Sequence, residues 1–129
     1  MPPGVVPALA ALRSHGLRLT VVSNANGRLC QMFERVGLAG AVDCMLDSHD
    51  EGVEKPDPRL FEIALARSGG DRETTIHVGD LYQVDVVGAR AAGIRGVLLD
   101  VAGLYADADC PRVSSLADLV AQVTRGVFD

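Results

Sequence analysis

Thr75-Ile76-His77-Val78-Gly79-Asp80-Leu81-Tyr82-Gln83-Val84-Asp85 is the stretch of sequence that indicates the fold. Its apolar run ends abruptly in Gly79-Asp80, a second aspartate follows five residues later, and small residues continue at helical spacing over 86–92. This order predicts a buried strand with a carboxylate at its carboxyl end, followed by a helix. Because ligands of open parallel sheets bind at that edge, the stretch predicts a functional site around Asp80.

Helices and strands alternate on both sides of this stretch. The spacing of apolar residues predicts helices over 5–15, 28–36, 58–68 and 115–124, and strands over 17–22, 41–46 and 96–99. Asp57 and Ser115 are expected to cap the helices that follow them. Residues 47–57 are expected to form a polar loop and residues 101–112 an irregular segment. This alternation predicts an α/β fold, a three-layer α/β/α Rossmann-like domain with a mostly parallel sheet of about four strands.

Length and composition narrow the class of protein. A chain of 129 residues predicts one domain, and a net charge of −5 argues against a partner made of nucleic acid. Three widely spaced cysteines, none in a Cys-x-x-Cys pair, argue against a zinc site or a disulfide framework. No apolar run approaches the roughly 20 residues of a membrane helix, and no secretion signal is recognisable. A cytoplasmic location without membrane association is therefore expected.

Four polar residues are expected to meet at the carboxyl edge of the sheet. Ser23 and Asp80 follow predicted strands, and Lys55, the one lysine beside eleven arginines, lies on a loop that can reach the same rim. Asp80 can hold Mg²⁺ together with substrate phosphate oxygens, Lys55 can neutralise a phosphoryl oxygen, and Ser23 can donate a hydrogen bond to one. Asp85 can hold Lys55 or a metal-bound water. The set suits phosphoryl transfer, which depends mainly on positioning and charge neutralisation.

Each of these residues also has a plain structural explanation. Ser23 lies among turn formers, Lys55 can be a solvated loop charge, and Asp85 suits the start of a helix. His77 lies within an apolar strand, where a core histidine with satisfied hydrogen bonds is expected. The run Asp47-Ser48-His49 contains the residue types of a hydrolytic triad, but neighbours in sequence rarely adopt that geometry.

The ordered motifs resemble the haloacid dehalogenase-like (HAD) hydrolase superfamily over nearly the whole chain. They are Val21-Val22-Ser23-Asn24, Lys55-Pro56-Asp57-Pro58, and Val78-Gly79-Asp80 with Asp85 and the Gly88-to-Gly93 segment. The resemblance implies that Ser23 and the backbone near Asn24 bind phosphate and that Lys55 stabilises charge. It also implies that Asp80 binds magnesium, with Asp85 as an accessory acid at the metal. The implied activity is magnesium-dependent hydrolysis of a small phosphate ester through an aspartyl-phosphate.

The sequence departs from this family at its beginning. HAD enzymes start with a strand that ends in Asp-x-Asp, the nucleophile and the general acid, and a cap usually follows. The family places that strand between those ending at Ser23 and Asp80. Here the one Asp-x-Asp, Asp107-Ala108-Asp109, follows no apolar strand and is interpreted as a solvated turn. The chain is therefore expected to be a partial core domain, 1–129, that is inactive alone.

Several alternatives stay open. A truncated start explains the missing segment with the fewest assumptions, and the alternative is a non-catalytic binding or regulatory module on the same fold. Unpaired strand edges would favour a homodimer or complementation by a strand from elsewhere. A 2-haloacid dehalogenase is less favoured. That chemistry needs no metal, and its last motif typically lacks the Gly-Asp pair followed by a spaced aspartate, whereas Gly79-Asp80 is intact here.

Overall fold

The computed structural model describes residues 4–129. The helices are α1 (Val5–Ser14), α2 (Leu29–Arg35), α3 (Ser48–Glu51), α4 (Pro58–Ser68), α5 (Val87–Ala91) and α6 (Leu116–Thr124). The strands are β1 (Thr20–Ser23), β2 (Cys44–Asp47), β3 (Ile76–Gly79), β4 (Arg95–Leu99) and β5 (Arg112–Val113). A π-helical turn, Tyr82–Val86, connects β3 to α5. None of the helices in the described part of the chain has the length and apolar character needed to span a bilayer.

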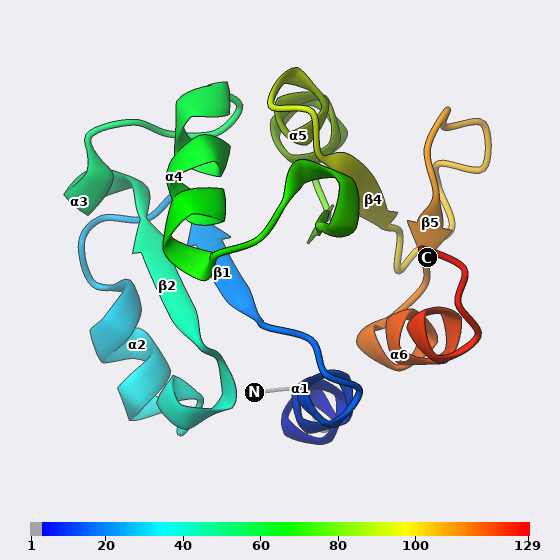
Figure 1. Cartoon of the computed structure of the whole chain (residues 1–129), viewed down its shortest axis with the longest axis horizontal. Coiled ribbons are helices and arrows are strands. Elements are labelled where there is room, and N and C mark those ends of the chain that lie inside the picture. The colour runs from blue at the N-terminus through cyan, green and yellow to red at the C-terminus, as the bar shows by residue number, and fades with distance from the viewer. Residues whose placement is uncertain (1–3) are drawn as a thin grey trace.

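The strands lie between two layers of helices (Figure 1). In that view α4 and α5 form the upper layer, and α1, α2 and α6 form the lower one. All strand pairs are parallel, and the chain passes through α2 between β1 and β2 and through α5 between β3 and β4. The expected α/β/α Rossmann-like architecture is therefore confirmed.

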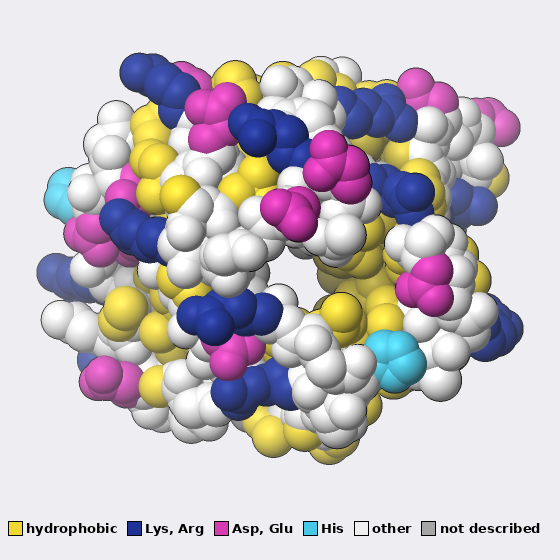
Figure 2. All heavy atoms as spheres, in the orientation of Figure 1, with side chains coloured by type: hydrophobic (Ala, Val, Ile, Leu, Met, Phe, Trp, Pro, Cys, Tyr) yellow, Lys and Arg dark blue, Asp and Glu magenta, His cyan; other side chains and the backbone are white. Residues whose placement is uncertain are grey.

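The strands form two separate sheets instead of one. One sheet has the order β1-β2 and the other β3-β4-β5, so β1 and β3 each keep an unpaired edge within the described chain. All four residues of β1 and of β3 are only half-buried, whereas the interior of β4 is fully buried. Figure 2 shows an opening through the centre of the molecule, in the region between the two sheets in Figure 1. The neighbours of the missing family strand thus do not pair directly with each other.

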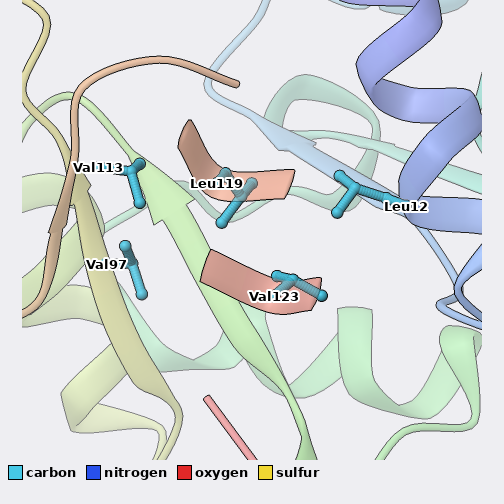
Figure 3. Packing of buried hydrophobic residues seen from close by; sticks show 5 residues of the cluster. All are labelled: Leu12, Val97, Val113, Leu119 and Val123. Carbon is cyan, nitrogen blue, oxygen red and sulfur yellow. The ribbon is translucent and has the colours of Figure 1, made fainter. Parts of the chain in front are cut away.

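The helical layers hold the two sheets together. In one layer, α4 contacts β1 and β2 and also α5, which packs on β4. In the other layer, α1 and α6 pack against each other. The apolar cluster beneath them joins residues of α1, β4, β5 and α6 (Figure 3), namely Leu12, Val97, Val113, Leu119 and Val123. Burial of each large side chain in this cluster contributes about 1.5–3 kcal/mol.

Two local expectations were wrong. The segment 47–57 is not all loop, because the Asp47 carboxylate accepts a hydrogen bond from the His49 N–H and caps α3. The segment 101–112 is not all irregular either, because Arg112 pairs with Leu98 at the start of β5. The expected caps at Asp57 and Ser115 are confirmed, since each side chain accepts a backbone N–H of its helix.

Candidate functional site

An ion pair joins Lys55, beside the sheet β1-β2, to Asp85, beside the sheet β3-β4-β5. Lys55 lies on the loop before α4, and Asp85 lies on the π-helical turn after β3. The distance from Lys55 Nζ to Asp85 Oδ1 is 2.7 Å, and the two side chains are only 11% and 4% exposed. The pair therefore lies at the carboxyl ends of β1 and β3, where the sequence predicts the site.

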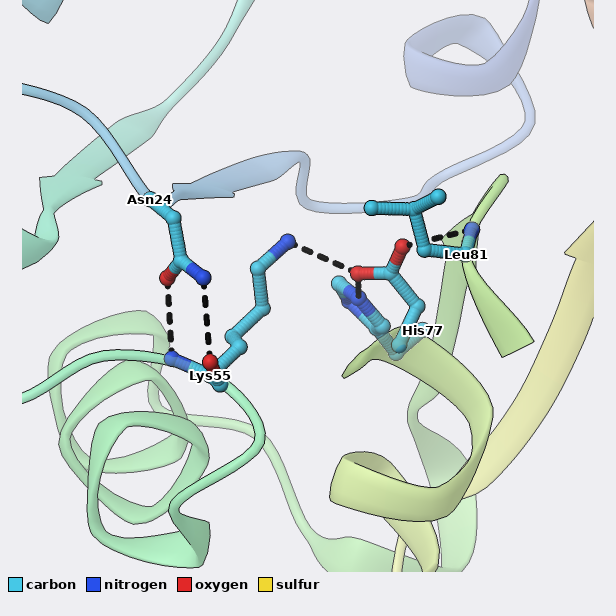
Figure 4. Close-up of polar contacts among 5 residues, drawn as sticks. Asn24, Lys55, His77 and Leu81 are labelled. Atoms are coloured by element: carbon cyan, nitrogen blue, oxygen red, sulfur yellow. Dashed lines mark hydrogen bonds and ion pairs between the residues drawn. The ribbon is translucent and has the colours of Figure 1, made fainter. Parts of the chain in front are cut away.

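Asn24 anchors the main chain of this lysine. Its amide Nδ2 donates to the Lys55 carbonyl at 3.0 Å, and the Lys55 N–H donates to Asn24 Oδ1 at 2.8 Å (Figure 4). The Lys55 loop is thus held to the turn that follows β1. The Asn24 side chain is engaged by these bonds, so the part of Asn24 left for phosphate is its backbone, and that role stays a prediction.

Three donors converge on the Asp85 carboxylate. Oδ1 faces Lys55 Nζ and also His77 Nε2 at 2.9 Å, while Oδ2 accepts the Leu81 N–H at 3.1 Å. Burial alone would raise the pKa of this carboxyl, but the hydrogen bonds from His77 and Lys55 and the lysine charge hold the pKa well below its usual value. Asp85 is consequently an anion across the physiological pH range.

Gly79 makes this arrangement sterically possible. A Cβ atom on Gly79 would overlap Cβ, Cγ and Oδ2 of Asp85, so the carboxylate occupies the space that any other residue's side chain would need. Sequence reasoning identified Gly79 only as part of a motif and His77 only as a core histidine. The spacing between His77 and Asp85 could have indicated their contact. After β3 the chain turns back, and the π-helical turn that contains Asp85 packs beside the strand that contains His77.

Ser23 and Asp80 lie next in sequence to the residues of this network. Ser23 ends β1 and is half-buried, and Asp80 follows β3 with an exposed side chain. Neither side chain makes a hydrogen bond within residues 4–129. The structure therefore brings Ser23 and Asp80 to the same edge as Lys55 and Asp85, with groups that can still bind a ligand.

The donor set fits magnesium in part. Residues 4–129 contain no group of three or more acidic, histidine or cysteine side chains placed to hold a metal ion. Mg²⁺ is, however, commonly bound by one or two carboxylates together with phosphate oxygens and waters. The exposed Asp80 carboxylate matches that requirement. Both oxygens of Asp85 already accept hydrogen bonds, and its role as a metal ligand stays a prediction.

The Asp47-Ser48-His49 run shapes the turn after Ser23. Asp47 Oδ2 accepts the N–H groups of Gly27 at 2.8 Å and Leu29 at 3.2 Å, and the Ser48 hydroxyl bonds the backbone of the same turn. The Asp47 and Ser48 side chains are buried, while His49 is exposed. These residues support the turn, and a triad is not formed.

The Asp107-Ala108-Asp109 motif lies on an exposed loop, as expected. Asp109 accepts hydrogen bonds from Tyr82 and Arg90, which fix this loop to the π-helical turn and α5. It follows no strand and therefore does not replace the missing family motif.

The comparison with protein families agrees with the motifs. Residues 1–93 match the family model described as haloacid dehalogenase-like hydrolase. The chain belongs to this family. The HAD-like chain is 42% identical over 96 residues to haloacid dehalogenase-like hydrolase domain-containing protein 3 of Bos taurus, covering 74% of this chain and 38% of the relative. It is also 42% identical over 93 residues to phosphoserine phosphatase of Thermus thermophilus, covering 71% and 37%.

Solved structures resemble the HAD-like chain over nearly its whole length. A HAD phosphatase from Thermococcus onnurineus superposes with a TM-score of 0.86 at 26% identity, covering 98% of this chain and 58% of that one. A 2-haloacid dehalogenase from Pseudomonas syringae gives 0.81 at 32% identity, covering 96% and 53%. The chain spans less than two fifths of the length of the curated relatives named above.

Proposed function

We propose that this HAD-like chain forms the phosphate- and magnesium-binding part of a phosphatase that acts on a small phosphate ester. The observation that carries the proposal is the buried Lys55–Asp85 pair at the sheet edge, with Ser23 and Asp80 beside it. Similarity to phosphoserine phosphatase and to a HAD phosphatase supports phosphate esters as the substrate class. A cytoplasmic setting is part of the proposal, supported by the free thiols of the three cysteines.

Each residue has a separate task in this proposal. Lys55 Nζ has three hydrogens and gives one to Asp85, so two remain to bind phosphoryl oxygens. The Ser23 hydroxyl donates to another phosphoryl oxygen. Asp80 would hold the magnesium ion, which when bound neutralises negative charge on the phosphoryl group. Asp85 orients the Lys55 ammonium toward that position through the hydrogen bond between them.

We further propose that a parallel strand inserts between β1 and β3. Both strands keep an unpaired edge, and their residues are only half-buried, so an inserted strand would gain hydrogen bonds on both sides. A carboxylate at the end of that strand would lie beside Lys55 and could serve as the nucleophile. A longer form of the polypeptide, a second copy or another protein could supply the strand. Without it, the chain is expected to bind phosphate and to show no turnover.

Magnesium binding and turnover test the proposal separately. Backbone amide signals near residue 80 should shift on adding Mg²⁺ with inorganic phosphate, and Asp80→Asn should abolish that shift. Asp107→Asn is the matched control, because this exposed aspartate lies outside the network and should leave binding unchanged. Loss of magnesium binding in neither variant, or in both, would contradict the assignment of Asp80.

Turnover on an aryl phosphate should stay at the buffer rate for residues 1–129 alone. Magnesium-dependent hydrolysis that disappears with Asp80→Asn would overturn the expected inactivity of the isolated chain. Light scattering across a range of concentrations tests strand donation between copies, since a monomer at all concentrations would argue against it.

A 2-haloacid dehalogenase is the second candidate, favoured by the structural similarity to such an enzyme at 32% identity. Release of halide from a 2-haloacid without magnesium, by a form that includes the inserted strand, would replace the phosphatase proposal. A partner that co-purifies at fixed stoichiometry, with no activity after the strand is supplied, would instead support a binding or regulatory module.

A further inference from the structure

We propose that His77 is a positioning residue, which holds the Asp85 carboxylate in place and thereby orients the Lys55 ammonium. The inference rests on the proposed function only where it takes Lys55 to be the cation that meets phosphate. The positioning role of His77 follows from the contacts around one oxygen of the Asp85 carboxylate.

His77 and Lys55 share that oxygen. His77 Nε2 lies 2.9 Å from Asp85 Oδ1, and Lys55 Nζ lies 2.7 Å from the same atom. An ionised carboxylate only accepts hydrogen bonds, so the hydrogen of the pair with His77 must be on Nε2. The two donors approach from different elements, β3 and the loop before α4, and the Leu81 N–H holds the other oxygen. The carboxylate is thus oriented from three sides.

The imidazole is itself held by packing. The Phe61 ring meets it edge-on, with ring centroids 4.8 Å apart and an interplanar angle of 82°. Phe61 is 1% exposed and belongs to the core between α4 and α5, so it gives the imidazole a rigid support. Side chains of His77 and Asp85 are 14% and 4% exposed, which restricts competition by water for their hydrogen bond.

A residue that only filled this space would not need a ring nitrogen. A leucine would fill the volume next to Phe61, but Asp85 Oδ1 would then keep Lys55 as its one side-chain donor. The carboxylate could rotate, and Lys55 would follow it. The proposal therefore predicts that the hydrogen bond of His77, more than its bulk, determines how tightly the Lys55 ammonium is held.

The single lysine of the chain makes this measurable without catalysis. Labelling with ¹⁵N-lysine yields one side-chain ammonium resonance, that of Lys55. The rate at which its hydrogens exchange with water is measured by NMR at mildly acidic pH and low temperature. His77→Leu should speed exchange about tenfold, the effect of losing one charge-assisted hydrogen bond in the network. His77→Gln, whose amide nitrogen reaches the Nε2 position, should return the rate to within about twofold of the original.

Two controls separate hydrogen bonding from packing. Phe61→Leu disturbs the support of the ring but keeps the donor, so it should change the exchange rate by less than about twofold. If His77→Leu does not fold, His77→Asn replaces it, because its shorter amide cannot reach Asp85 and should also give fast exchange. Equal rates for the Gln and Asn variants, an unchanged rate in His77→Leu, or an equally large change in Phe61→Leu would overturn the proposal.

Addition of inorganic phosphate with Mg²⁺ distinguishes this inference from the proposed function. A shift of the Lys55 resonance on adding them supports its role in binding phosphate. If no shift occurs but the His77 variants behave as described, the positioning role stands and the phosphatase proposal fails. If phosphate shifts the resonance equally in all variants and their exchange rates are the same, the positioning role fails instead.

Discussion

Gly79→Ala should destabilise the protein strongly, although alanine is an ordinary residue in a strand. The backbone of Gly79 is not in the left-handed region, so alanine meets no conformational penalty there. The cost comes from the methyl group, which would overlap three atoms of the Asp85 side chain. Asp85 can move aside only by giving up its bonds to Lys55, His77 and Leu81.

The magnitude follows from the groups that lose their partners. Disrupting a buried charge pair costs about 3–5 kcal/mol, and a single hydrogen bond to a charged group contributes about 1.5–3 kcal/mol. If Asp85 loses Lys55 and keeps part of its other contacts, Gly79→Ala should cost about 3–4 kcal/mol. Domains of this size are stable by about 5–15 kcal/mol, so the loss would be a large fraction of the total.

Urea denaturation followed by circular dichroism measures this cost, because the chain has no tryptophan to report unfolding. The midpoint should fall by about 2 M for a typical slope. Gly40→Ala is the matched control, since a Cβ there meets no atom within 4 Å and the backbone is outside the left-handed region. That variant should stay within about 0.5 kcal/mol of the original.

A double-mutant cycle tests the cause. In an Asp85→Gly background none of the three overlapping atoms of the Asp85 side chain is present, so the cost of Gly79→Ala should fall to less than about 1 kcal/mol. A cost that stays the same with and without the Asp85 side chain would refute the steric argument. So would a cost below about 1 kcal/mol in the original background.

Three further predictions concern single polar groups. Thr20→Val should stabilise the protein by about 1 kcal/mol and raise Tm by about 4 °C, because the Thr20 hydroxyl is buried without a hydrogen-bond partner in the described chain. The control is Thr124→Val, which removes a hydroxyl that donates a hydrogen bond at 2.8 Å and should therefore give no gain in the same thermal scan. Asn24→Ala should speed hydrogen exchange at the Lys55 backbone amide by about five- to tenfold, and unchanged protection would refute the anchoring role. Asp47→Asn should lower the urea midpoint at neutral pH, because backbone N–H groups hold the pKa of Asp47 below its ordinary value despite burial. Stability from a lowered carboxyl pKa is present above about pH 4 and is lost as the pH falls through the folded-state pKa, so the two proteins should converge in acid; a pH-independent difference would contradict this.

Much of the fold was predictable because its signals are local. Helices α4 and α6 were predictable from the spacing of their apolar residues and from the capping residues Asp57 and Ser115, which act within one helical turn. The α3 helix was missed because it is a single turn whose cap, Asp47, also binds the backbone of a distant turn. The strand Arg112–Val113 was missed because two residues carry no recognisable periodicity and become a strand only by pairing with β4.

The residues of the candidate site were predictable one by one, but their connections were not. The ends of predicted strands pointed to Ser23 and Asp80, and the exceptional use of lysine pointed to Lys55. Two contacts depend on the directions of side chains. Asn24 holds Lys55 through its side-chain amide, and His77 contacts the same oxygen of Asp85 as Lys55 does. Sequence spacing alone does not determine these directions, because they depend on what packs against each group.

The order of elements, the parallel arrangement of strands and the carboxylate at the end of β3 were present in the sequence, because periodicity, caps and turn residues act over a few positions. The division into two sheets and the convergence of donors on Asp85 emerged only in the folded molecule. Lys55 and Asp85 are 30 positions apart in the chain and meet because helices and strands from both halves pack around them. Such contacts depend on the position of every intervening element. The sequence therefore indicates the Asp80 carboxylate after β3, whereas the contacts of Lys55 and His77 with Asp85 are known only from the folded structure.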